Sequence, residues 1–228
     1  MRRFAPYEAR WAILPTPSVR IDFVLLKDTP KSRRTRARIL DAATRLFAEV
    51  GYHPATNQAI AEAAGLTRGA MLYHFASREA LLEAAIEHIH ARRLALFDAA
   101  AANPPPGVDA TAHAIAAYWE LLSQPAFVAF AELEAAARTD PMLRERLAPA
   151  QGAFDQAQVG APFSALAQAG QGPRLQASRD LARFLLEGLA RANLTYDRDP
   201  RIRNLIAVVD RAVRMLNRKG DVQELWPD

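Results

Sequence analysis

Residues 56–75 constrain the fold of this chain more than any other segment, because they carry start and stop signals for two short helices. The hydroxyl of Thr56 can accept a hydrogen bond from an amide one turn into a first helix. Gly65 stands where a helix end favours a left-handed residue. Thr67 can then cap a second helix that runs to about His74. Two short helices joined by a tight, glycine-containing turn make a helix-turn-helix.

The flanks of this motif sharpen its interpretation. Residues 38–52 read Arg-Ile-Leu-Asp-Ala-Ala-Thr-Arg-Leu-Phe-Ala-Glu-Val-Gly-Tyr, and residues 73–82 read Tyr-His-Phe-Ala-Ser-Arg-Glu-Ala-Leu-Leu. In this order and at these spacings, residues 33–92 resemble the TetR family of bacterial one-component regulators. The resemblance is weak after residue 92. It implies an all-helical homodimer that binds a DNA operator and releases it when a small molecule enters the second domain.

Hydrophobic periodicity predicts helices throughout the rest of the chain. Half of the residues are hydrophobic, and Ala and Leu dominate them, which favours helix over strand. We expect helices at 33–50, 77–102, 109–123, 126–138, 141–158, 162–170, 178–196 and 200–218. The fold class is therefore predicted to be all-α. A three-helix helix-turn-helix DNA-binding domain is expected over 31–92, with its motif at about 55–75. A helical ligand-binding and dimerisation domain is expected over 93–228.

Residues 1–30 differ from the rest of the chain. Four prolines interrupt them, and no helical period survives. The basic start lacks the apolar segment and cleavage site of a signal peptide. We expect this extension to be mostly disordered. Its origin stays open between a functional arm, a misplaced translation start and an inert tail.

Charge and composition narrow the function. Residues 1–80 hold 13 Lys/Arg and 7 Asp/Glu, whereas residues 81–228 hold 16 and 18. A basic front on a slightly acidic body suggests contact with a polyanion, although a solvated arginine-rich face would look the same. The chain has no Cys, which fits a reducing cytoplasm, and no apolar run of the ~18 residues that a membrane span needs. Metal, cofactor and enzyme motifs are not recognised, so neither a metal, a cofactor nor catalysis is expected.

The second helix of the motif holds the strongest candidates for DNA contact. Arg68 can reach guanine O6 and N7 or clamp a phosphate, and Thr67 suits a phosphate oxygen. Gly69 lacks a side chain, so it would let the protein backbone approach DNA closely, or would merely relieve crowding inside the bundle. The resemblance adds Tyr73 and His74 as phosphate contacts, against the alternatives of a core aromatic and a packing histidine.

The resemblance also places two helix-start residues at phosphate-contacting positions. These are Thr56 and Arg78. Family members more often carry Lys at the position of Arg78. Arg34 and its basic neighbours open the first helix. They could add backbone or minor-groove contacts, or could simply be solvated.

The second domain should hold an effector and a partner subunit. Candidate pocket residues are Trp119, Phe127, Phe130 and Phe154, with His113, Glu132, Glu134 and Gln156 as polar hooks. Because this domain offers few candidates for buried charge, the ligand is expected to be small and mostly apolar. Apolar stripes on the last two long helices are expected to form a four-helix dimer interface. Its candidate residues are Phe184, Leu185, Gly188, Ile206, Val209 and Val213.

These features predict a transcriptional regulator, in the form of a repressor, that binds a palindromic operator as a homodimer. The alternative is a helical interaction or sensor module without specific operator binding. Effector identity, operator sequence and the choice between repression and activation are not encoded in a readable form.

Overall fold

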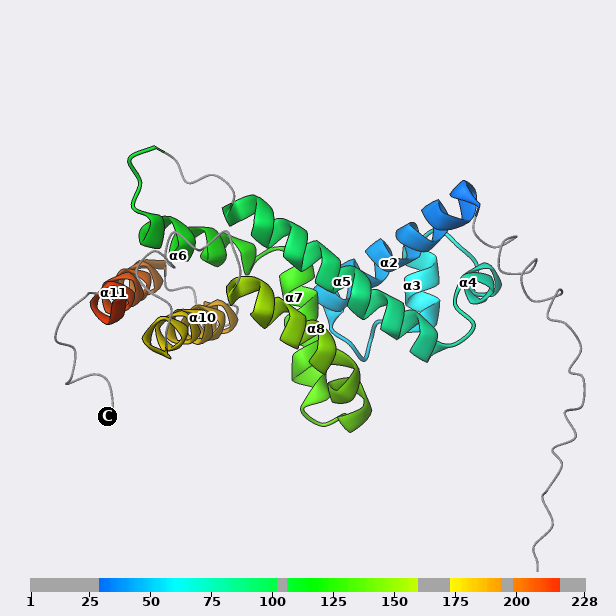
Figure 1. Ribbon diagram of the computed structural model, residues 1–228. Helices are drawn as coiled ribbons and strands as arrows, with labels where there is room; N and C mark the ends of the chain where they lie inside the picture. The colour runs from blue at the N-terminus through cyan, green and yellow to red at the C-terminus, as the bar shows by residue number, and fades with distance from the viewer. Residues whose placement is uncertain (1–28, 102–105, 160–172, 194–198, 218–228) are drawn as a thin grey trace, which may run out of the picture. The chain divides into compact units, whose positions relative to one another are not determined.

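The computed structural model describes residues 29–101, 106–159, 173–193 and 199–217 (Figure 1). Within these ranges the regular structure is entirely helical, which confirms the predicted all-α class. The helices are α2 (Pro30–Val50), α3 (Asn57–Ala63), α4 (Arg68–His74), α5 (Arg78–Ala101), α6 (Ala110–Leu121), α7 (Pro125–Ala137), α8 (Pro141–Val159), α10 (Pro173–Asn193) and α11 (Asp199–Asn217). Residues 1–28 and the helix predicted at 162–170 lie outside the described residues.

Two compact units divide the chain, residues 1–37 and residues 38–228. The described part of the first unit is the start of α2, which begins at Pro30, three residues earlier than expected. Proline is tolerated in a first helical turn because its missing N–H would have no partner there. Thr29 completes this start, since its Oγ1 accepts a hydrogen bond from Ser32 N at 3.1 Å.

The helix-turn-helix forms through the local signals that the sequence carries. Thr56 Oγ1 accepts from Ala59 N at 3.2 Å, and Thr67 Oγ1 accepts from Ala70 N at 3.1 Å. Gly65 adopts a φ of 63°, a left-handed conformation that side chains rarely tolerate. Both caps and the turn are confirmed as predicted.

One hydrophobic core joins the helix-turn-helix to two later helices. Side chains from α2, α3, α4 and the first half of α5 pack with side chains from α7 and α8. Its largest fully buried members are Ile39, Phe47, Ile60, Met71, Leu81, Ile89, Phe130, Leu133 and Leu143. The core therefore continues across the domain boundary predicted at residues 92 and 93.

A second core lies between the end of α5 and the helices α6, α7, α8, α10 and α11. Its buried members are Phe97, Ile115, Tyr118, Leu121, Phe127, Phe154, Leu186, Val209 and Val213. Helix α5 thus supplies Leu81 and Ile89 to the first core and Phe97 to the second. No described helix is both long and apolar enough to cross a membrane.

Because α7 and the helix-turn-helix share the first core, a substitution that leaves a void beside α7 should also destabilise the helix-turn-helix. Leu133→Ala removes a fully buried side chain and should lower the free energy of unfolding by about 2–5 kcal/mol. Amides of α3 as well as α7 should then lose protection in hydrogen exchange. Met142→Ala, at an exposed position of α8, is the control and should change stability by less than about 0.5 kcal/mol. Loss of protection confined to α7 and α8 would show that the two parts do not share a core.

Candidate functional site

Helix α4 is held by one face and presents the other to solvent. Met71 is fully buried and Phe75, which follows the helix, is nearly so. Arg68 and Gly69 are exposed in the first turn of the helix, beside the cap Thr67. The arrangement leaves the predicted DNA-reading positions accessible while the helix itself stays fixed on the first core.

Gly69 does not relieve crowding within the described protein. A Cβ atom built on this glycine would meet no atom within 4 Å, and its φ is not positive. The alternative in which Gly69 accommodates a neighbour inside the bundle is therefore wrong. Neither internal packing nor backbone conformation explains the missing side chain.

Tyr73 and His74 are the last two residues of α4. Tyr73 is 56% exposed, so the alternative of a core aromatic is wrong. Its ring meets the His74 ring edge-on, with centroids 5.3 Å apart. This geometry leaves the Tyr73 ring accessible to an outside partner.

Arg78 is engaged with its own chain. Its Nη1 donates to Ala55 O at 3.0 Å and to Asn57 Oδ1 at 3.3 Å, and its Nη2 donates to Tyr52 O at 3.3 Å. The guanidinium also lies over the Tyr52 ring, 5.2 Å from its centroid. In the free protein Arg78 therefore fastens the loop before α3 to the start of α5.

The two remaining candidates for DNA contact are exposed. Thr56 uses its hydroxyl as the α3 cap described above and is otherwise accessible. Arg34 is exposed in the first turns of α2 and belongs to the unit formed by residues 1–37.

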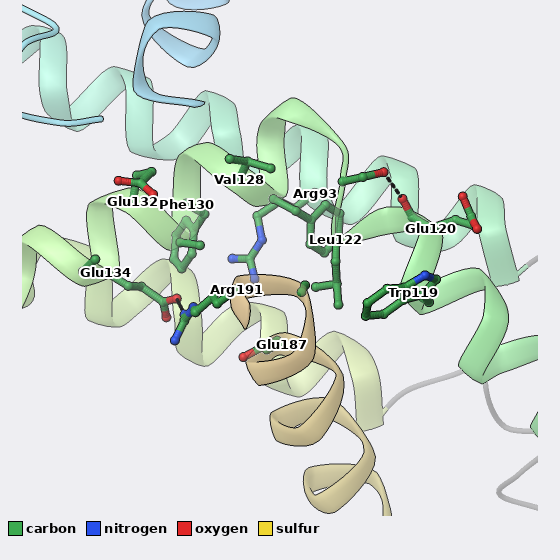
Figure 2. Close-up of a pocket in the computed structure, with 15 residues that line it drawn as sticks. Arg93, Trp119, Glu120, Leu122, Val128, Phe130, Glu132, Glu134, Glu187 and Arg191 are labelled. Atoms are coloured by element: carbon green, nitrogen blue, oxygen red, sulfur yellow. Dashed lines mark hydrogen bonds and ion pairs between the residues drawn. The ribbon is translucent and has the colours of Figure 1, made fainter. Parts of the chain in front are cut away.

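A cavity of 440 Å³ opens between α5, α6, α7 and α10 (Figure 2). This volume lies within the range of small-molecule sites. Trp119, Phe127 and Phe130 line it, together with Leu122 and Val128. The fourth candidate is placed differently, because Phe154 is fully buried against Phe97 and Phe127 and does not line the cavity.

Sequence reasoning missed one residue of this cavity, Arg93. It lines the cavity from α5, although its side chain is only 4% exposed. The guanidinium carbon lies 3.9 Å from the ring centroids of both Phe130 and Phe154, and 5.3 Å from that of Phe127. Burial lowers the pKa of Arg93 to about 10, which still leaves it charged at neutral pH. A signal existed in the sequence, because Arg93 interrupts the apolar stripe of α5 between Ile89 and Phe97.

Four carboxylates also line the cavity, and two of them, Glu134 and Glu187, are paired with an arginine. Glu134 lies 3.6 Å from Arg191, and burial raises the pKa of Glu134. Glu187 accepts from Arg183 Nε at 3.0 Å and from Tyr118 Oη at 2.9 Å. Both glutamates are only partly buried, and among the described residues of this domain Arg93 is the one buried charge, in line with the expectation of few buried charges. Burial and the neighbouring Glu187 raise the pKa of Tyr118, which keeps its phenol protonated as a donor.

The other two predicted polar hooks lie elsewhere. His113 Nε2 lies 3.2 Å from Ala100 O, and Gln156 is exposed on α8. Neither residue lines the cavity, whereas Glu132 and Glu134 do.

The last two helices expose an apolar face that differs in part from the predicted one. Phe184 is 61% exposed on α10, and Leu185 and Gly188 are exposed beside it. On α11 the predicted Val209 and Val213 are each 4% exposed inside the second core, and Ile206 packs partly against it. These three residues turn inward because α11 has apolar residues on two sides. Its exposed apolar residues are Leu205, Val208 and Met215.

Comparisons with known proteins agree with this geometry. Residues 39–85 match the family described as "Bacterial regulatory proteins, tetR family". The HTH-type transcriptional regulator UidR of Escherichia coli K12 is 40% identical over 67 residues, which are 29% of this chain and 34% of UidR. The HTH-type transcriptional repressor Rv1474c of Mycobacterium tuberculosis is 48% identical over 46 residues, 20% of this chain and 25% of the repressor. The matches thus span about a third or less of these relatives.

The fold extends the likeness beyond the matched segment. SCO4454, a TetR-family transcriptional regulator from Streptomyces coelicolor, superimposes with a TM-score of 0.61 and 20% identity over 89% of this chain and 98% of that one. At this identity the likeness concerns the fold, and it includes the helices after α5. Residues 39–85 thus carry the helix-turn-helix sequence of the tetR family of bacterial regulatory proteins, and the fold of the chain is similar to that of solved TetR-family regulators.

Proposed function

We propose that this protein is a cytoplasmic transcriptional repressor that binds a palindromic DNA operator as a homodimer and is released by a small ligand. The observation that carries the proposal is the accessible face of α4. That face offers Arg68, Gly69 and Tyr73 to solvent, while Met71 anchors the helix from behind. A short helix fixed in this way is the part of a helix-turn-helix that enters the major groove.

The dimer part of the proposal is supported by the exposed apolar residues of α10 and α11. Phe184, Leu185, Leu205 and Val208 are large and exposed in the single chain. Helices α10 and α11 pack on each other, so a second copy could meet both helices at once. A twofold interface of this kind would present two α4 helices to two half-sites about one helical turn apart, on the order of 34–36 Å.

The release part of the proposal is supported by the course of α5. This helix lines the cavity with Arg93 and packs Leu81 and Ile89 into the core that holds α4. A ligand that favours one position of α5 would therefore favour one position of the recognition helices. By linkage, the ligand must weaken DNA binding by the same factor by which DNA weakens ligand binding.

A helical interaction or sensor module without specific operator binding is the second candidate. The cavity and the exposed apolar face would suit it equally well. The exposed glycine on α4 favours the DNA-binding function, because an interaction module has no need of a bare backbone there.

Arg68→Ala tests the operator hypothesis directly. If Arg68 reads a base, the substitution should weaken binding to DNA from upstream of the protein's own gene by about 1–3 kcal/mol and relax sequence preference. A footprint should also reveal two symmetric half-sites. Arg203→Ala, at an exposed position of α11 on a different side of the helix from Leu205 and Val208, is the control and should leave binding unchanged. A footprint and an affinity that survive Arg68→Ala would remove this residue from the interface.

Gly69→Ala separates folding from DNA binding. Alanine fits the free protein and favours helix, so stability should rise slightly, by up to about 1 kcal/mol. Operator affinity should fall if DNA approaches the backbone at this position. Gly152→Ala is a matched control, because Gly152 is also exposed in a helix with nothing within 4 Å of the built Cβ. Equal operator affinity for both variants, measured by fluorescence anisotropy, would place the DNA elsewhere.

Phe184→Glu combined with Val208→Glu tests the dimer face. Two unpaired carboxylates in a buried seam should disfavour association by several kcal/mol while leaving the monomer folded, since both side chains are exposed in the single chain. Sedimentation should report a monomer, and operator affinity should drop because the half-sites are no longer engaged together. Met142→Glu controls for added charge at another exposed apolar position. A dimer that persists in the double variant would mean that the interface lies elsewhere.

A further inference from the structure

The guanidinium of Arg93 has no hydrogen-bond acceptor at two of its nitrogens. Both Nε and Nη1 are buried and unpartnered among the described residues. The rings of Phe130 and Phe154 attract the charge through their faces, but ring faces do not replace acceptors for N–H groups in the guanidinium plane. A buried charged donor without an acceptor is costly for the protein to maintain. These two N–H groups can therefore donate to an acceptor group on a bound ligand.

The carboxylates of the cavity do not supply that acceptor. Glu134 is paired with Arg191, and Glu187 is shared by Arg183 and Tyr118. Both act on Arg93 only through longer-range attraction. Glu134 and Glu187 each have an arginine partner, so the positive charge of Arg93 is left without a hydrogen-bonded carboxylate.

We propose that the cavity binds a small aromatic organic acid whose carboxylate is seated on Arg93 (Figure 2). Trp119, Phe127 and Phe130 offer an apolar lining to the body of the molecule. The carboxylate accepts the hydrogen bonds that Nε and Nη1 lack, in a geometry that a planar guanidinium favours.

Charge at the rim limits the ligand to a monoanion. Glu120 and Glu132 line the same cavity, so a dianionic group such as a phosphate monoester would meet additional repulsion. One free guanidinium matches one carboxylate. This inference rests on the proposed ligand-released function and gives its effector a chemical class, in place of the mostly apolar molecule expected from composition.

The experiment compares three probes of similar shape on the full chain. 2-Naphthoate, neutral 2-naphthamide and cationic 2-naphthylmethylammonium are titrated by calorimetry into the wild-type protein in the absence of DNA. We expect 2-naphthoate to bind about tenfold or more tighter than 2-naphthamide, the ratio that one charge-assisted hydrogen bond contributes. Equal affinities, tighter binding of the ammonium, or no measurable binding of 2-naphthoate would each overturn the proposal.

Two variants assign the effect to Arg93. Arg93→Met keeps the length of the side chain, removes the charge and should abolish the preference for 2-naphthoate over 2-naphthamide. Arg92→Met removes the neighbouring arginine of α5, which is exposed and does not line the cavity, and should preserve that preference. A preference that survives Arg93→Met would overturn the assignment. Should Arg93→Met fail to fold, the Nε–H resonance of Arg93 in wild-type protein provides the readout, and a resonance that 2-naphthoate does not shift would overturn it equally.

Operator binding is measured separately, so the two hypotheses can fail independently. Loss of the carboxylate preference with intact operator binding would overturn only this inference. Carboxylate binding through Arg93 that never affects a DNA complex would uphold this inference and contradict ligand-controlled release.

Discussion

Helix α5 contributes to two hydrophobic cores at once, and the other described helices after residue 38 pack into one or both of these cores. Its first half packs against the helix-turn-helix and against α7 and α8, and its last turns contribute to the second core, which also holds side chains of α6, α7, α8, α10 and α11. Neither core closes without it. Because close-packed interiors transmit small displacements rather than absorb them, a shift of α5 in one core must be accommodated in the other. Under the proposed function, this constraint would couple a ligand bound in the cavity to the position of α4.

Arg93 occupies the point on α5 where the two cores meet. One of the rings that flank its guanidinium, Phe130, belongs to the first core, and the others, Phe127 and Phe154, belong to the second. An apolar residue here would fuse the cores more stably, because burying a charge costs free energy that cation–π attraction only partly offsets. Arg93 lowers the stability of the free protein and lines a cavity, and binding of a ligand in that cavity would explain why it is there. In the proposed complex the ligand's carboxylate completes this junction.

The recognition helix depends on its surroundings more than its capping signals suggest. Helices α3 and α4 have seven residues each, which is too short for either to be stable alone in water. Ile60, Met71 and Phe75 fix them on the first core. Arg78 adds a second restraint by tying the loop before α3 to the start of α5. The exposed face of α4 is therefore presented in one orientation before any DNA arrives.

The sequence by itself determined the features that rest on neighbouring residues: the Thr56 and Thr67 caps, the left-handed Gly65, the helical periodicity and hence the all-α class. Helical spacing also identified apolar stripes, but a stripe does not say what it faces. Only the tertiary structure decided that Val209 and Val213 turn into the second core while Leu205 and Val208 stay exposed. It alone decided that Arg78 donates to backbone carbonyls before α3 and that Arg93 is buried with two nitrogens lacking an acceptor. These outcomes depend on contacts between residues far apart in the chain, which no local pattern encodes.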